Sequence, residues 1–190
     1  MRTLYLHGFA SSSQSSKARA FKAALPQLEI PELDGGDFEH LTITGQLEVI
    51  ERTLQGEPAR LIGSSMGGYL AALYAAAHPE VSRMVLLAPA LGFAPRWKEK
   101  TSLEVFHHGT GTMRRVHYGL IEDAMQYPAT PDFTQPALIF HGVNDDVVPV
   151  GNSRVFTATH ANAKLVELDS DHELLNVMDR IVAEGVPFLI

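Results

Sequence analysis

The chain has 190 residues, of which 45% are hydrophobic and 19% charged, a composition that excludes an intrinsically disordered or collagen-like protein. It contains no cysteine, which excludes disulfides, thiolate metal sites and a cysteine nucleophile. Its formal net charge of -7 disfavours a nucleic-acid partner, because phosphate binding normally needs a basic face.

Neither a membrane span nor an export signal is visible in the sequence. The longest apolar run, residues 84–95, is interrupted by Pro89 and Gly92 and is shorter than the ~18 residues that a spanning helix needs. The first residues lack an apolar stretch followed by a small-residue cleavage site, which is the pattern of a secretory signal. We therefore expect a cytoplasmic protein without membrane insertion.

The first half of the chain alternates between predicted strands and helices. The apolar runs at residues 3–6, 28–30, 59–62 and 83–87 are its predicted strands. A serine-rich loop and a helix that ends before Pro26 follow the first strand. A second helix has apolar residues at helical spacing, and an alanine-rich third helix covers residues 66–78. The apolar positions of the second helix are Ile43, Leu47, Ile50 and Leu54.

The second half continues this alternation after an interruption. Residues 92–131 break the rhythm and predict an inserted cap with one or two helices. Residues 137–140 and 164–168 are the fifth and sixth predicted strands. A final helix carries apolar residues on one face and is expected to stop at Gly185 and Pro187. Its apolar positions are Leu174, Leu175, Met178, Ile181 and Val182.

Strands that alternate with helices predict an α/β protein with a mainly parallel sheet covered on both faces. Several strands are continuous apolar runs, as a sheet buried on both faces requires. We expect a single domain over residues 1–190, with the cap inserted at approximately residues 92–131.

The strongest local signal is Gly63-Ser64-Ser65-Met66-Gly67, which follows a predicted strand and opens the alanine-rich helix. The pattern G-x-S-x-G in this setting is a nucleophile elbow. A serine at the tip of so sharp a turn often has a positive φ, so glycine is favoured two residues to either side. Ser64 does not fit, because Ile62 and Met66 flank it where small residues are needed. The alternative is a glycine-rich turn without chemistry.

A serine hydroxyl needs a base and a group that orients that base, expected in the order serine, acid, histidine at later strand ends. Asp145 and Asp146 follow the fifth strand, and His172 follows the sixth. Since the carboxyl ends of parallel strands share one edge of the sheet, these groups can converge with Ser65. We assign the acid to Asp145, with Asp146 as the alternative.

The other histidines have simpler interpretations. His7 and His141 lie at strand ends and are expected to brace turns. His78 and His160 fall near helix ends, where a histidine interacts favourably with the helix dipole. His107 and His108 lie in the cap and are expected to face solvent. Only His172 follows the last predicted strand and opens the last helix, so it is the candidate base.

Two backbone amides are candidates for stabilising an oxyanion. The Met66 N–H lies at the start of the helix that follows Ser65, and the helix dipole favours negative charge there. The second donor is expected from His7-Gly8-Phe9, through the Phe9 N–H, with Gly8 allowing close approach to the substrate. The serines at 11–16 are interpreted as a loop with a helix N-cap.

These motifs, in this order, resemble the α/β-hydrolase superfamily. The motifs are His7-Gly8-Phe9, Gly63-x-Ser65-x-Gly67, His141-Gly142-x-x-Asp145-x-x-Val148-Pro149 and Asp171-His172. Within it the chain is similar to the small bacterial YqiA-like esterases, which share the opening Tyr5-Leu6-His7-Gly8-Phe9, the loop at 33–37 and the short length.

The resemblance implies a minimal α/β-hydrolase fold: a doubly wound, mainly parallel sheet of about six strands with a small helical cap. The chain starts at what resembles the third strand of the superfamily, and its strands should follow the order 2-1-3-4-5-6. Ligands bind where such an order reverses, between the first and third strands. Phe9 and Ser65 follow those two strands.

The leading hypothesis is a serine esterase that cleaves small-molecule esters of small or short-to-medium acyl chains through an acyl-enzyme. Neither a metal nor an organic cofactor is expected. One alternative is an acyl-CoA or other thioesterase, in which five basic cap residues would contact the substrate phosphates. The competing interpretation is that these five residues form a solvated helix face. They are Arg96, Lys98, Lys100, Arg114 and Arg115. The other alternative is a non-catalytic binding or scaffold protein of the same fold.

The apolar cap residues have two interpretations. They line an acyl pocket beneath the cap, or they form the cap's own core, which we favour slightly. They are Phe93, Trp97, Phe106, Tyr118, Ile121 and Met125. The sequence specifies neither the natural substrate nor the oligomeric state.

Overall fold

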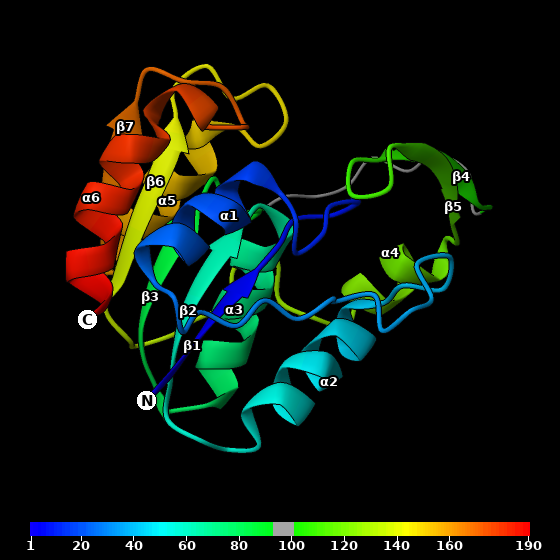
Figure 1. Ribbon diagram of the computed structural model, residues 1–190, viewed down its shortest axis with the longest axis horizontal. Coiled ribbons are helices and arrows are strands. Elements are labelled where there is room, and N and C mark those ends of the chain that lie inside the picture. The colour runs from blue at the N-terminus through cyan, green and yellow to red at the C-terminus, as the bar shows by residue number, and fades with distance from the viewer. Residues whose placement is uncertain (93–100) are drawn as a thin grey trace.

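The structure, a computed structural model, describes residues 1–92 and 101–190 and is built around a central parallel sheet (Figure 1). The sheet has five strands in the order β1-β2-β3-β6-β7, and every neighbouring pair is parallel. The strands are β1 (Arg2–Leu6), β2 (Ala59–Ser64), β3 (Val81–Leu87), β6 (Ala137–Gly142) and β7 (Ala163–Leu168). The predicted α/β architecture and strand order are therefore confirmed.

The second predicted strand, at residues 28–30, is reduced to a single bridge. Glu29 pairs in parallel with Leu4 on the outer side of β1. The Tyr5 amide donates to the Glu29 carbonyl at 2.8 Å, and the Glu29 amide donates to the Thr3 carbonyl at 2.9 Å. The pairing stops there because Pro31 has no N–H to continue the ladder.

Helices cover both faces of the sheet. Helices α1 (Ser16–Ala24) and α6 (Met178–Leu189) pack on one face, against a cluster that includes Tyr5, Ile62 and Val85. Three helices, α2 (Ile43–Leu54), α3 (Met66–Ala77) and α5 (Val150–Thr159), contribute to the cluster on the other face. Ala71, Ala72 and Ala75 of α3 are buried, and their small side chains let this helix lie close to the sheet.

Two helices differ from the sequence predictions. The final helix is preceded by a 3₁₀ turn, Leu175–Val177, and starts only at Met178. It continues through Gly185 and Pro187 to Leu189, so the predicted stop was wrong. A Cβ on Gly185 would meet Val85 at 3.3 Å, so glycine here serves close packing on β3. Helix α5 was absent from the predictions because it presents only Val150, Ser153 and Phe156 to the interior.

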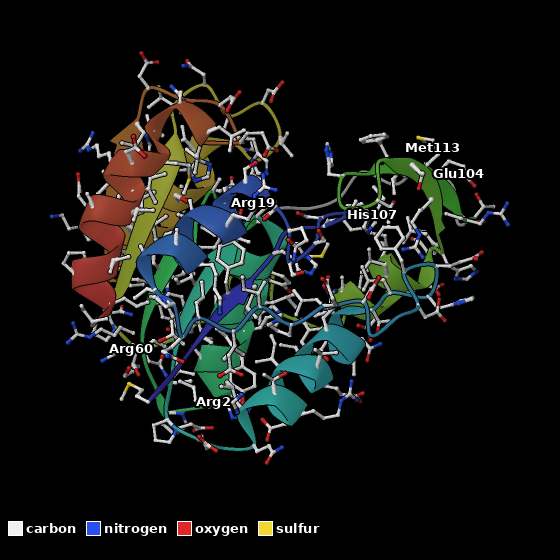
Figure 2. All side chains as sticks on the ribbon, viewed as in Figure 1. Arg2, Arg19, Arg60, Glu104, His107 and Met113 are labelled. Carbon is white, nitrogen blue, oxygen red and sulfur yellow. The ribbon has the colours of Figure 1, made fainter. Side chains whose placement is uncertain are left out.

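The expected cap region contains a β-hairpin, so the prediction of a helical cap was incomplete. Strands β4 (Leu103–His107) and β5 (Thr112–Val116) pair antiparallel, and helix α4 (Gly119–Ala124) follows. Gly111 has a φ of 68° in the connecting turn, which favours glycine. Inward residues alternate with outward ones: Figure 2 shows His107 on the body side, with Glu104 and Met113 on the outer side.

Hydrogen bonds connect this hairpin and α4 to the body. The His108 amide donates to the Ala10 carbonyl, and the His117 amide donates to the Glu39 carbonyl, each at 2.7 Å. Thr44, at the start of α2, donates from its amide to Asp123 Oδ2 at 2.8 Å. The hairpin thus lies over the loops that precede α1 and α2. Among the described residues no helix combines the length and apolarity that crossing a bilayer requires.

Candidate active site

Ser65 occupies the sharp turn between β2 and α3. Its φ of 54° and ψ of −117° are strained for a non-glycine residue, as the elbow pattern predicts. The turn is held by backbone hydrogen bonds to the neighbouring strand end: the Ser65 amide donates to Leu87 and its carbonyl accepts from Ala90. The rigid turn presents the Ser65 hydroxyl at the carboxyl edge of the sheet.

The two glycines of the elbow are required by close backbone approach. A Cβ on Gly67 would lie 2.0 Å from the Leu6 carbonyl oxygen, and one on Gly63 would lie 2.4 Å from the Gly67 carbonyl oxygen. Any side chain at these positions would push α3 away from β1 and β2. The pattern G-x-S-x-G is therefore explained by packing as well as by turn geometry.

His172 links Ser65 to Asp145. Its Nε2 lies 3.0 Å from Ser65 Oγ, and its Nδ1 lies 2.7 Å from Asp145 Oδ2. The loop that carries His172 packs on the end of β6, where a Cβ on Gly142 would meet the Ser170 carbonyl oxygen at 2.3 Å. The three side chains, distant in sequence, thus form one hydrogen-bonded chain.

Asp145, and not Asp146, is the carboxylate in contact with His172. The Asp145 side chain is fully buried, whereas Asp146 is exposed. Asp145 Oδ1 accepts hydrogen bonds from the Val147 and Val148 amides at 2.9 and 2.8 Å. Burial alone would raise the pKa of Asp145, but hydrogen bonds from His141, His172 and the Val148 amide hold that pKa well below its usual value. Asp145 is therefore ionised at neutral pH.

The loop after β1, which carries the expected oxyanion donor Phe9, runs beside the serine. A Cβ on Gly8 would lie 3.4 Å from Ser65 Cβ and 4.0 Å from Ser65 Oγ, so His7-Gly8-Phe9 runs directly past the hydroxyl. Within the described ranges, neither the Phe9 nor the Met66 amide donates a hydrogen bond to the protein. Both amides are thus available to an oxygen bound next to Ser65.

Most of the other histidines have local structural partners. His7 Nε2 accepts from the Leu33 amide at 3.3 Å, and His141 Nε2 lies 2.9 Å from the Val148 carbonyl oxygen, so both brace turns as expected. His78 stacks on Tyr74 at the end of α3, and His160 stacks on Phe156 at the end of α5.

His107 differs from its prediction. It is buried and meets the Phe38 ring edge-on at 4.7 Å, while His108 is exposed as expected. Burial, and to a smaller extent the nearby Arg114 charge, lower the pKa of His107. It was missed because nothing in a polar cap segment shows which way a hairpin residue faces.

Sequence reasoning also missed the contact between His141 and Asp145. His141 Nε2 lies 3.2 Å from Asp145 Oδ2. The signal available was the spacing of four residues between His141 and Asp145 around the strand-end turn. His141 was predicted only to brace that turn. The contact places a second imidazole on the buried carboxylate.

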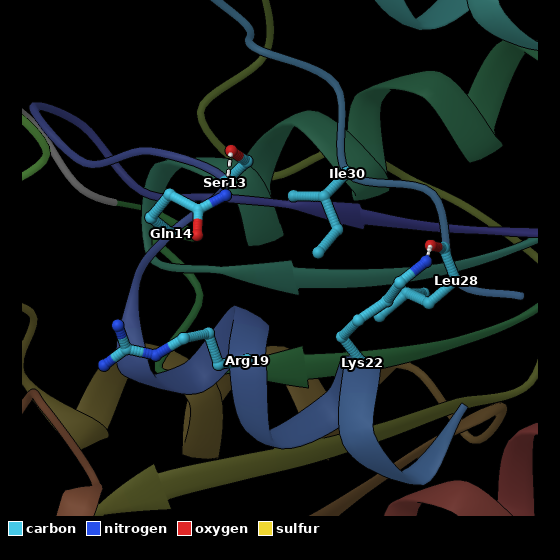
Figure 3. Close-up of a pocket in the computed structure, with 6 residues that line it drawn as sticks. All are labelled: Ser13, Gln14, Arg19, Lys22, Leu28 and Ile30. Atoms are coloured by element: carbon cyan, nitrogen blue, oxygen red, sulfur yellow. Dashed lines mark hydrogen bonds between the residues drawn. The ribbon is translucent and has the colours of Figure 1, made fainter. Parts of the chain in front are cut away.

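Two cavities lie near the loop after β1. A small one, of about 10 Å³, is bounded by residues that include Phe9, Phe38, Gln46 and His107, and it has room for about one water. A larger hollow of about 350 Å³ lies between the serine-rich loop and α1 (Figure 3). Neither cavity is lined by Ser65, Asp145 or His172.

The cap residues considered for an acyl pocket are only partly placed. Phe93 and Trp97 lie outside the described residues, as do Arg96, Lys98 and Lys100. Phe106 and Met125 are 49% and 78% exposed, so the interpretation as cap core was wrong for these two. In the described ranges no group of three or more His, Asp or Glu side chains is arranged to hold a metal ion.

Comparisons with known proteins identify the family of this chain. The sequence model of UPF0227, described as an uncharacterised protein family, matches residues 2–184. Monoacylglycerol lipase abhd6-B of Xenopus laevis is 27% identical over 203 residues, which cover 95% of this chain but only 58% of the relative. The chain therefore spans less than two thirds of that relative's length.

Solved structures share the fold. Est1E from Butyrivibrio proteoclasticus with bound ferulic acid aligns with a TM-score of 0.82 at 21% identity, covering 98% of this chain and 86% of that one. Mouse alpha/beta hydrolase domain-containing protein 10 aligns with a TM-score of 0.78 at 19% identity, covering 98% and 88%. The predicted α/β-hydrolase fold is thus confirmed.

Proposed function

We propose that this chain, which belongs to the UPF0227 family and has the α/β-hydrolase fold, is a serine hydrolase of carboxylic esters. The observation that carries the proposal is the continuous chain from Ser65 through His172 to buried Asp145, with contacts of 3.0 and 2.7 Å. The similarity to a protein named as a monoacylglycerol lipase supports ester hydrolysis.

In the first half of the reaction, Ser65 Oγ attacks the ester carbonyl carbon and its proton passes to His172 Nε2. Asp145 stabilises the resulting imidazolium through Nδ1. The carbonyl oxygen becomes an oxyanion and accepts hydrogen bonds from the Phe9 and Met66 amides. When the tetrahedral intermediate collapses, the bond to the leaving oxygen breaks and His172 returns the proton to it, which releases an alcohol.

In the second half, water attacks the acyl-enzyme. His172 takes a proton from the water as the new bond forms, and the same two amides hold the second oxyanion. Collapse breaks the bond to Ser65 Oγ, which recovers its proton from His172, and the carboxylic acid leaves. Each oxyanion donor lowers the barrier by about 3 kcal/mol in comparable sites. Metal and cofactor take no part in this sequence.

Small or short-to-medium acyl chains are the proposed substrates. The cavity next to Phe9 has room for only about one water and does not hold an acyl chain, so turnover of p-nitrophenyl esters of increasing acyl length is the test of this proposal. A cytoplasmic location and a single domain with an inserted cap remain parts of the same proposal.

The two basic cap residues that the structure describes, Arg114 and Arg115, lend little support to the thioesterase alternative. Arg114 lies over the Phe38 ring at 5.0 Å and 3.9 Å from Asp34, and Arg115 donates to Glu104 at 3.2 Å. Both are already engaged with the protein. The scaffold alternative leaves unexplained why three polar groups meet at a strained turn.

The proposal is tested with a fluorophosphonate probe and a short-chain p-nitrophenyl ester. Wild type should be labelled and active, and Ser65→Ala should lose labelling and at least ~10⁴-fold in kcat. Ser64→Ala is the matched control, a neighbouring serine that should keep labelling and turnover. Turnover retained by Ser65→Ala contradicts the proposal, and a kcat/KM higher for a thioester than for the ester favours the thioesterase.

A further inference from the structure

A second imidazole lies behind Asp145, and the mechanism above does not use it. His141, in β6, is fully buried, and its Nδ1 lies 2.8 Å from Ser153 Oγ of α5. Its Nε2 lies 2.9 Å from the Val148 carbonyl oxygen and 3.2 Å from Asp145 Oδ2. Ser153 is also fully buried. Both ring nitrogens therefore have partners within the protein.

These partners determine where the His141 proton lies. A carbonyl oxygen only accepts, so Nε2 must carry hydrogen to bond with Val148, and the same N–H faces Asp145 Oδ2. Nδ1 is then free to accept a hydrogen bond from the Ser153 hydroxyl. Ser153 thus favours the tautomer that directs the Nε2–H toward the carboxylate.

The contact constrains the Asp145 carboxylate. Oδ1 is held by the Val147 and Val148 amides, and Oδ2 is shared between the His172 and His141 rings. Rotation of the carboxyl group would break contacts to both oxygens, with no solvent to replace them. Oδ2 is therefore kept in line with His172 Nδ1, the direction that orients the base toward Ser65.

We propose that His141, held by Ser153, is a positioning residue for ester hydrolysis: its Nε2–H fixes the Asp145 carboxylate so that His172 faces Ser65. This inference rests on the proposed function. Through His141, the hydrogen-bonded chain that starts at the Ser65 hydroxyl extends inward to Ser153 of α5, which has no other part in the reaction.

The test compares His141→Phe and His141→Gln in two backgrounds, wild type and Asp145→Asn. His141→Phe removes the N–H and is expected to lower kcat by about 10²-fold in the wild-type background, the cost of misplacing a reacting group by about 1 Å. The amide of His141→Gln can donate in place of Nε2 and should recover most of that loss. In Asp145→Asn, where the carboxylate is already gone, His141→Phe should have little further effect, because the two residues act as one unit.

A purely structural role for His141 predicts a different pattern. His141→Phe would then reduce activity by the same factor in both backgrounds, and that result, or unchanged activity in wild type, overturns the inference. His160→Phe is the matched control, since His160 also contacts α5, by stacking on Phe156, but has no contact with Asp145 among the described residues. Failure of the wild-type protein to react with the fluorophosphonate would instead contradict the proposed function.

Ser153→Ala provides a second route if His141→Phe does not fold. It removes a single buried oxygen while leaving both imidazoles, so it should lower kcat in the same direction but less. The low-field NMR signal of the His172 Nδ1 proton, which reports its bond to Asp145, should shift in folded Ser153→Ala. An unchanged signal together with unchanged kcat overturns the inference.

Discussion

His172 Nε2 lies 3.0 Å from Ser65 Oγ, although 107 positions separate the two residues. The contact exists because β2 and β7 end at the same edge of a parallel sheet and each continues into a tight turn. The Ser65 turn is held by glycine close packing, and the His172 loop is held against Gly142. The base and the nucleophile are therefore positioned by backbone, before any substrate binds.

Asp145→Asn should lower kcat by about 10⁴-fold, because an amide no longer selects the His172 tautomer or stabilises its cation. Asp146→Asn is the matched control and should leave kcat close to that of wild type, because Asp146 is exposed. Steady-state kinetics on a p-nitrophenyl ester measure both. The reverse pattern would assign the acid to Asp146.

Gly67→Ala should destabilise the protein by at least about 2 kcal/mol, because its methyl group would lie 2.0 Å from the Leu6 carbonyl oxygen. Gly151→Ala, in the first turn of α5, meets nothing within 4 Å and should stabilise it by up to about 1 kcal/mol. Urea denaturation measures the free energy of unfolding of each variant. Equal effects of the two substitutions would contradict the packing at the elbow.

The stability contributed by Asp145 should depend on pH. Its folded-state pKa is lowered from the ordinary value of 3.8, so the ionised form is favoured by folding. That contribution is fully present above the unfolded pKa and is lost as pH falls through the folded pKa. The difference in unfolding free energy between wild type and Asp145→Asn should therefore stay constant above about pH 5 and shrink as the pH is lowered below the unfolded value of 3.8. A difference that is constant with pH would show that the carboxylate is not stabilised in the folded state.

Tyr5→Phe should leave stability unchanged or raise it by about 1 kcal/mol. The Tyr5 hydroxyl is buried and has no hydrogen-bond partner among the described residues, although Ser64 and Ser15 lie near it. Burial raises its pKa well above the usual value, so it stays neutral.

Tyr74→Phe is the comparison, because the Tyr74 hydroxyl donates to Glu51 Oε2 at 2.6 Å. Loss of that bond should cost about 1 kcal/mol. Thermal or urea denaturation distinguishes the two variants. A clear destabilisation by Tyr5→Phe would indicate that a buried water satisfies the hydroxyl.

Much of the fold could be predicted from local patterns. The apolar runs of β1, β2, β3, β6 and β7 and the periodicity of α2 are properties of adjacent residues. The run at 28–30 was overestimated, because the apolar pattern does not show that Pro31 ends the pairing after Glu29. Helix α5 was missed because only Val150, Ser153 and Phe156 face the interior, which leaves little apolar periodicity to recognise.

The candidate site, like the fold, could be predicted only in part. The G-x-S-x-G pattern and the strand-end positions of Asp145 and His172 are visible in the sequence, because turn chemistry and chain order are local. The sequence does not show that Asp145 rather than Asp146 contacts His172, that His107 faces inward, or that His141 contacts Asp145. Adjacent residues in a loop or hairpin point in opposite directions, and only the packing of distant segments decides which direction is the interior.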